Sequence, residues 1–280
     1  MQPSDRKGRG NLHRVQSPSR HVEFPAFRRY EASRQEANNA MMALLAGSTL
    51  AVHTLQLTEG SQQLLPDIFP GVGHIKYFNL RTQDANELLQ DTGHHLGAVA
   101  VPYALAVHED FIMTVLDLLV GLGYARQADG NNSNKSKNMP KAWNMHEAVY
   151  LTLGITPPSS GPVADRLQQF HLLRHMRNAQ IHNGGEVSSD LIDAVNAMSA
   201  KACTEWARIG RRQPSDITST PEVHFTVFDI FAVFAVTKAL GRQVNDVLAN
   251  EVGIARWADI CIADYASISS QRPNSDQWMR

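Results

Sequence analysis

Apolar residues recur every three or four positions along most of the chain, which is the spacing of one face of an α-helix. The pattern predicts helices over residues 30–57, 82–99, 102–123, 142–153, 162–182, 190–209, 222–250 and 250–269, the last as a helix or a helical hairpin. We expect a short strand or extended connector at 74–81 and a short strand at the start of 222–250. The predicted fold class is all-α.

Proline and glycine set the ends of two of these helices. Pro102 and Pro162 are each expected to begin one, because proline fits the first helical turn, where its missing N–H is not needed. Asn183-Gly184-Gly185 ends the helix over 162–182, since glycine adopts the left-handed cap without strain. Loops are predicted at PDIFPGVGH (66–74) and ADGNNSNKSKNMP (128–140).

Composition and periodicity divide the chain into four parts. Residues 1–22 are polar and rich in Arg, Ser and Pro, so we expect a disordered tail. Residues 23–100 form an N-terminal helical region without an assigned role, and residues 101–269 a helical domain with clearer periodicity. Residues 270–280 are expected to be a flexible tail.

Charge, cysteine content and the lengths of apolar runs exclude several classes of protein. The net charge is −1, so a strongly basic nucleic-acid coat is absent and any RNA contact has to be local. Two cysteines are too few for a disulfide scaffold, and no apolar stretch follows the basic N-terminus as in a secretory signal. The sequence contains no run of about 18 apolar residues, the length that would predict a membrane span. We expect a cytoplasmic protein without membrane contact.

The stretch RHMRNAQIHNGG (174–185) concentrates polar and cationic side chains at one helix end. One interpretation is structural, because cations in the last turns face the negative end of the helix dipole. The other is RNA cleavage without a metal, which requires proton transfer at the 2′-hydroxyl and the leaving oxygen and a positive donor for the phosphate. Histidine titrates in the right range and the arginine fork fits phosphate oxygens, so the candidate catalytic residues are Arg177, Asn178 and His182.

RNAQIHNGG (177–185) resembles the signature of the HEPN superfamily, in which an arginine, commonly followed by a polar residue, precedes a histidine by four to six residues. The resemblance covers residues 102–250 and implies a HEPN-like helical bundle with metal-independent endoribonuclease activity. By resemblance, Arg177 holds the scissile phosphate, His182 acts as general base or acid toward the 2′-hydroxyl, and Asn178 positions one of them. The products then carry a 2′,3′-cyclic phosphate.

Members of this superfamily typically pair as two-fold dimers. The resemblance therefore implies a homodimer in which Arg177 and His182 of both chains share one RNA cleft. It also implies a role as a toxin or in phage defence, with an antitoxin or another defence protein as a partner. One alternative is a catalytically silent HEPN-like module that binds RNA, a nucleotide or a protein. Another is that the resemblance is accidental and the chain is an unrelated helical structural protein.

The spacing of the motif raises a geometric difficulty. Positions five apart on a helix point about 140° apart, so Arg177 and His182 need not share a face. Arg174, Asn178 and His182 do share one, at intervals of four. Either Arg177 reaches round with its long side chain, or the helix unwinds near His182, or a partner chain completes the site.

Supporting residues are expected on other segments. HED (108–110) supplies Glu109 or Asp110 to orient the motif through a charge-assisted hydrogen bond, as active members of the superfamily do, although a solvated helix turn explains these acids equally well. Weaker RNA contacts are expected from Arg174, His175, His171, Lys135 and Lys137.

Other chemistries find little support in the sequence. The adjacent His94 and His95 point in different directions on a helix, and neither HExxH nor a Cys–His grouping occurs. His108-Glu109-Asp110 with His146-Glu147 offers an oxygen-rich di-metal site in principle, but we expect neither a catalytic metal nor a cofactor. GxSxG and GxxxxGK[ST] motifs are also missing.

Overall fold

The computed structural model describes residues 23–57, 62–124 and 144–268. Within these ranges the chain forms eleven α-helices, one 3-10 helix and two isolated bridges, without a strand. The predicted all-α fold class is confirmed. The predicted tails over 1–22 and 270–280, and the loop that carries Lys135 and Lys137, lie outside the described residues. None of the helices in the described ranges is long and apolar enough to cross a membrane.

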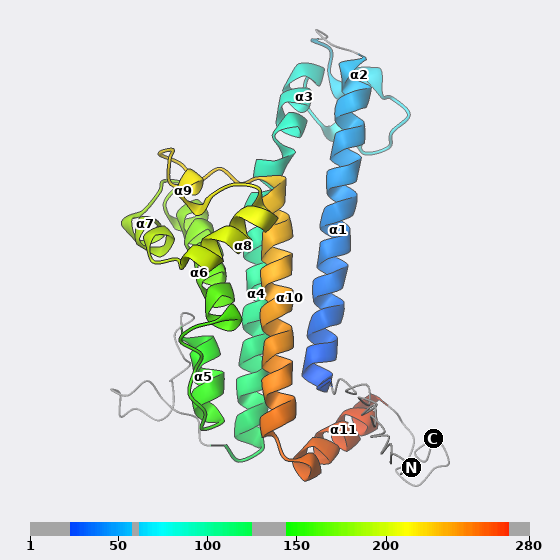
Figure 1. Ribbon diagram of the computed structural model, residues 1–280. Coiled ribbons are helices and arrows are strands. Elements are labelled where there is room, and N and C mark those ends of the chain that lie inside the picture. Colours follow the sequence, from blue (N-terminus) through cyan, green and yellow to red (C-terminus); the bar gives the residue numbers. More distant parts are fainter. Residues whose placement is uncertain (1–22, 58–61, 125–143, 269–280) are drawn as a thin grey trace, which may run out of the picture.

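Four long helices set the architecture (Figure 1): α1 (Pro25–Gln56), α4 (Thr92–Gly121), α6 (Pro162–His182) and α10 (Val227–Glu251). α4 and α10 run side by side in the same direction at the centre, while α1 and α6 run the opposite way on their two sides. The shorter elements are α2 (Leu65–Ile68), η1 (Ile75–Tyr77), α3 (Thr82–Gln90), α5 (Met145–Thr152), α7 (Ser189–Asn196), α8 (Ala200–Gly210), α9 (Pro214–Ile217) and α11 (Ile254–Ile268).

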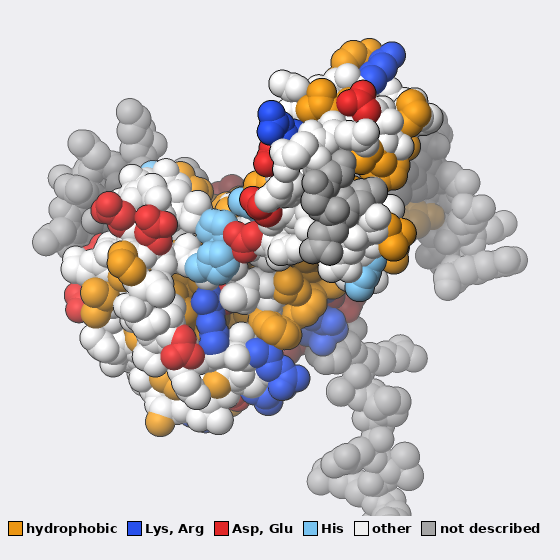
Figure 2. Space-filling view, turned by 90° about the horizontal axis from the view of Figure 1, so that it is seen from above, with side chains coloured by type: hydrophobic (Ala, Val, Ile, Leu, Met, Phe, Trp, Pro, Cys, Tyr) orange, Lys and Arg blue, Asp and Glu red, His pale blue; other side chains and the backbone are white. Residues whose placement is uncertain are grey.

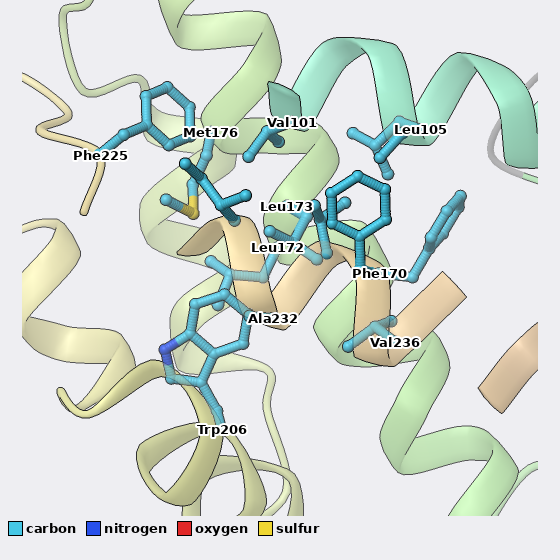
Figure 3. Packing of buried hydrophobic residues seen from close by; sticks show 14 of the residues in the cluster. Val101, Leu105, Phe170, Leu172, Leu173, Met176, Trp206, Phe225, Ala232 and Val236 are labelled. Carbon is cyan, nitrogen blue, oxygen red and sulfur yellow. The ribbon is translucent and has the colours of Figure 1, made fainter. Parts of the chain in front are cut away.

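One apolar cluster joins α6 to the central pair. Phe170, Leu173 and Met176 of α6 are fully buried against α4 and α10, and Trp206 of α8 lies at the edge of the same cluster (Figure 3). Burying a side chain of this size contributes about 1.5–3 kcal/mol. The packing therefore fixes both the position and the rotation of α6, the helix that carries the candidate motif.

A second cluster joins the start of α1 to the central pair. Phe24, Phe27 and Tyr30 are buried there with Phe111 of α4, and the rings of Tyr30 and Phe111 stack with centroids 4.4 Å apart. Gly241 of α10 permits this approach, because a Cβ at that position would lie 2.5 Å from Cε1 of Tyr30. The N-terminal helix is thus part of the same packed body as α4 and α10.

The prediction that Pro102 begins a helix is wrong. α4 begins at Thr92 and continues through the proline. Proline in a helix interior loses one backbone hydrogen bond and crowds the preceding turn. Ala100, Val101 and Leu105 lie fully buried around it, and their packing offsets that cost. The predicted domain boundary between residues 100 and 101 consequently falls inside one continuous helix.

The predicted helix over 190–209 is two helices, α7 and α8. Ser199 ends the break between them, and its hydroxyl accepts the backbone N–H of Ala202 as a helix N-cap. Ser188 caps α7 in the same way through the N–H of Leu191. Apolar residues keep a helical spacing across the break, so periodicity alone did not reveal it.

The predicted short strands do not form. Residues 75–77 make the 3-10 helix η1, and the predicted loop at 66–74 begins inside the short helix α2. At the start of 222–250, Glu222 makes only an isolated bridge with Glu186, and α10 begins at Val227. The side chain of Asp229 fixes that start, because its Oδ2 accepts both the backbone N–H and the hydroxyl of the N-cap residue Thr226.

The predicted motif helix is confirmed: α6 spans Pro162–His182. Asn183 is its C-cap, and Gly184 and Gly185 follow with φ of 62° and 97°. Both glycines therefore occupy the left-handed region that favours this residue. The backbone N–H groups of Asn183 and Gly185 both bond to the carbonyl of Ala179, which closes the helix directly after His182.

Candidate functional site

Glu109 of α4 joins the two arginines of the motif helix. Nε of Arg174 lies 3.0 Å from Oε1 of Glu109, and Nη2 of Arg177 lies 3.7 Å from Oε2. The side chains of Arg174, Arg177 and Glu109 are 5%, 21% and 19% exposed. Charges interact more strongly in such a setting than in open water. Two cations therefore share one carboxylate.

Arg177 reaches round α6 toward the face that carries Asn178. Its Nη1 donates a hydrogen bond to Oδ1 of Asn178 at 3.0 Å, while Nη2 faces Glu109. Its buried Nε has no hydrogen-bond partner in the part of the chain that the structure describes. Of the three arrangements that the sequence left open, unwinding of the helix near His182 does not occur, because α6 stays helical as far as His182.

His182 is the last residue of α6 and is exposed. Within the described ranges its imidazole takes part in no hydrogen bond or ion pair. It lies four positions after Asn178, which is about 6 Å further along the helix axis. The structure thus brings Arg174, Arg177, Asn178 and Glu109 into contact and leaves His182 separate from them.

The two candidate acids of α4 have different surroundings. Glu109 faces α6 and pairs with both arginines. Asp110 is exposed and forms no ion pair with a described residue, and its backbone carbonyl accepts a hydrogen bond from Thr114. Of the two candidate acids, Glu109 is therefore the one that contacts the motif helix.

Burial keeps two predicted RNA-contacting histidines neutral. It lowers the pKa of His171 to about 4, and the charges of Arg174 and His175 act in the same direction. Burial also lowers the pKa of His175, although Asp190 opposes the shift. Neither imidazole adds a positive charge at neutral pH. Arg174 is itself buried, so Arg177 is the more accessible cation of this site.

A chain of buried polar groups lies behind the site. Nε2 of His146 is 2.9 Å from Nε2 of His108, whose Nδ1 is 2.9 Å from the hydroxyl of Tyr30. Tyr30 donates to the carbonyl of Thr237 at 2.9 Å. Because this hydroxyl has one proton, His108 donates to it through Nδ1 and accepts from His146 through Nε2. Both histidines are therefore neutral with fixed tautomers.

Their pKa values agree with that assignment. Burial lowers the pKa of His108 to about 3. Burial, followed by the charges of His108, His171 and Arg174, lowers the pKa of His146 well below the usual histidine range. The sequence singled out these two histidines only as members of a di-metal grouping. In the structure they bond to each other, and no cluster of three or more His, Cys, Asp or Glu side chains among the described residues has the arrangement of a metal site.

The surface around the bundle carries both signs of charge. Seen from above, acidic and basic side chains are interspersed and no continuous basic face is visible (Figure 2). A net charge of −1 over 280 residues agrees with this picture. Phosphate recognition on such a surface has to depend on local groups of cations rather than on a general basic field.

Comparison of the chain with protein-family models, with curated proteins and with solved structures finds no match. The arrangement of the side chains is therefore the basis for the function proposed below.

Proposed function

We propose that this protein is a metal-independent endoribonuclease with a HEPN-like bundle, acting as a homodimer. The observation that carries the proposal is the pairing of Glu109 with Arg174 and Arg177 on α6, with His182 exposed at the end of the same helix. The acid comes from the first core helix of the resemblance, and the arginine and histidine come from the motif itself. The half-buried Arg177 suits phosphate binding, and the exposed His182 suits proton transfer.

Arg177 suits phosphate binding because its guanidinium is held in place. Glu109 and Asn178 each contact one of its terminal nitrogens. Because the side chain is already held in place, it loses less conformational entropy when it binds a phosphate. A planar fork of donors fits two phosphate oxygens and stabilises the charge that develops during transfer. Arg174 adds positive charge from the preceding turn of the helix.

His182 suits proton transfer because the residue is exposed and its imidazole forms no hydrogen bond or ion pair with another described residue. In the proposed reaction it takes the proton of the 2′-hydroxyl, and the 2′ oxygen forms a bond to phosphorus. The bond from phosphorus to the 5′ oxygen breaks, and this oxygen leaves with a proton. The products are a 2′,3′-cyclic phosphate and a 5′-hydroxyl. The reaction requires two proton transfers, and each chain supplies one exposed motif histidine. We therefore propose a dimer that brings two copies of His182 to one cleft.

The biological setting follows from the resemblance alone. We propose RNA cleavage in the cytoplasm as a toxin or phage-defence activity, with an antitoxin or another defence protein as partner. The two cysteines, Cys203 and Cys261, are both free, which suits a reducing compartment.

Cleavage of a labelled mixed-sequence RNA in EDTA tests the proposal. We expect the wild-type chain to cut the RNA, to leave the DNA of the same sequence intact and to produce 2′,3′-cyclic phosphate ends. His182→Ala and Arg177→Ala should each lower the rate by about a hundredfold or more, because they remove proton transfer and phosphate binding respectively. Matched controls are His53→Ala and Arg208→Ala, which remove an exposed histidine and an exposed arginine elsewhere.

Three outcomes contradict the proposal. Equal cleavage by all variants would place the activity outside this site. Cleavage that EDTA abolishes would show metal dependence. Absence of cleavage by a folded wild-type dimer would favour the silent RNA-binding module, a function that one observation already suits: Glu109 pairs with both arginines.

A further inference from the structure

A polar pocket of about 530 Å³ lies between α1 and α10. Residues of α6 do not line it, so it is separate from the site described above. Seven of its ten lining residues are charged or carry a side-chain amide, which excludes an apolar ligand: Glu31, Arg34, Gln35, Asn38, Asn39, Lys238 and Arg242. The remaining three are Phe231, Phe234 and Ala235. A volume in this range suits a small organic ligand.

Positive charge dominates the pocket. Arg34, Lys238 and Arg242 supply three cations against the single carboxylate of Glu31, which leaves two positive charges uncompensated among the lining residues. Burial raises the pKa of Glu31, but the hydrogen bond and charge of Arg34 and the charges of Lys238 and Arg242 outweigh that effect and lower it overall. All three cations therefore act on the same small region.

Arg34 is the fixed centre of this group. It is only 7% exposed, and Glu31 accepts hydrogen bonds from its Nε and Nη2, both at 2.8 Å. Its Nη1 donates no hydrogen bond to any residue in the described ranges. A buried guanidinium with one unused nitrogen is a preorganised donor for an anion. Lys238 and Arg242, four residues apart on α10, lie on one face of that helix.

An aromatic ring and side-chain amides complete the lining. Phe231 is 36% exposed, whereas Phe234 is 3% exposed and buried in the core. An exposed ring beside a cationic pocket offers a surface on which a nucleobase can stack. The amides of Asn38 and Asn39 supply both donors and acceptors for the polar edge of a base or a sugar.

We propose that the pocket between α1 and α10 binds a nucleoside monophosphate, with the phosphate at Arg34, Lys238 and Arg242 and the base against Phe231. The phosphate monoester carries about two negative charges at neutral pH. That charge matches the excess positive charge of the pocket and disfavours a metal cation as its occupant. The site is independent of the proposed ribonuclease activity.

Calorimetric titration of the full chain with adenosine 5′-monophosphate and uridine 5′-monophosphate tests this assignment. We expect at least one of them to bind, with adenosine, uridine and inorganic phosphate each about tenfold weaker or more. Lys238→Gln with Arg242→Gln should weaken nucleotide binding by about tenfold or more, since it removes charge-assisted hydrogen bonds. Phe231→Leu should weaken binding of the nucleotide and leave that of inorganic phosphate unchanged.

Matched controls separate this site from other cations and from the candidate catalytic site. Lys201→Gln with Arg208→Gln removes two exposed cations elsewhere and should leave the affinity unchanged. His182→Ala, which tests the ribonuclease proposal, should also leave it unchanged. Retained thermal stability of each variant shows that the fold is intact.

The proposal is overturned if neither nucleotide binds at millimolar concentration, or if the Lys238/Arg242 variant binds as tightly as the wild type. Equal affinity for inorganic phosphate and for both nucleotides would overturn the role of Phe231. A ten-residue single-stranded RNA that binds where both mononucleotides fail would identify a track for a longer strand instead.

Discussion

At the scale of single residues, His108 is fully buried and each of its ring nitrogens forms one hydrogen bond. A second proton on its ring would remove the acceptor that faces His146 and would place a charge where no water reaches. His146 meets the same penalty. These two residues therefore stabilise the fold only while they are neutral, and they make the bundle sensitive to acid.

We predict that stability falls steeply as pH decreases below about 6.5, the ordinary pKa of histidine in the unfolded chain. In the folded chain burial lowers the pKa of His108 to about 3. Between pH 6.5 and pH 3 the unfolded state therefore binds more protons than the folded state. Each buried neutral histidine of this kind lowers the free energy of unfolding by about 2 kcal/mol when the pH falls from 7 to 5. Urea denaturation at several pH values measures this. His108→Gln with His146→Gln should flatten the dependence, while exposed His182→Gln should not, and parallel curves for wild type and the double variant would refute the explanation.

At the scale of whole helices, local signals decided how much the sequence predicted. Pro162 and the Asn183-Gly184-Gly185 turn mark both ends of α6, and both ends were predicted correctly. α4 was misjudged because Pro102 carries the signal of a helix start, and only the packing around it keeps the helix continuous. Local propensity predicts an element reliably where tertiary packing does not override it.

The candidate site shows the same division. The motif residues Arg177 and Asn178 were named from the sequence, and their mutual contact follows from adjacency. The choice of Glu109 over Asp110 depends on which side of α4 meets α6, and neighbouring positions on a helix point about 100° apart. The sequence shows both acids, but it does not indicate which of them faces α6. The pairing of His108 with His146 depends on packing between separate helices and was not predictable either.

The glycines of the chain provide a prediction at this scale. Gly184 has a φ of 62°, so Gly184→Ala should cost about 1–2 kcal/mol at the end of α6. Gly47 lies inside the exposed part of α1, and nothing lies within 4 Å of a Cβ built there, so Gly47→Ala should instead stabilise by about 0.5–1 kcal/mol. Urea denaturation of the two variants should shift the midpoint in opposite directions. Shifts of the same sign would show that one of these two backbone conformations is not as described.

At the scale of the whole molecule, contacts between distant segments unite the bundle. The backbone N–H of Phe24 donates to Oδ1 of Asn245 at 2.9 Å, and Tyr30 connects α1 to both α4 and α10 through His108 and Thr237. The sequence pattern predicted α1 as a helix but assigned it to a region apart from the rest. Its docking depends on a tyrosine that fits over a glycine in a helix about two hundred positions later, which no local pattern reveals.

Gly241 offers a direct test of this docking. A Cβ at this position would lie 2.5 Å from the Tyr30 ring, so Gly241→Ala forces α1 to shift and should cost about 1–3 kcal/mol. Because α1 shares its cluster with α4 and α10, we expect the wild type and the variant each to unfold in one cooperative transition, the latter at lower temperature. Gly121→Ala is the control, since nothing lies within 4 Å of a Cβ built in this last turn of α4, and its midpoint should not fall. Scanning calorimetry with circular dichroism distinguishes the outcomes. Two separate transitions, with only the first shifted by Gly241→Ala, would mean that α1 unfolds independently of the helices that carry the candidate site.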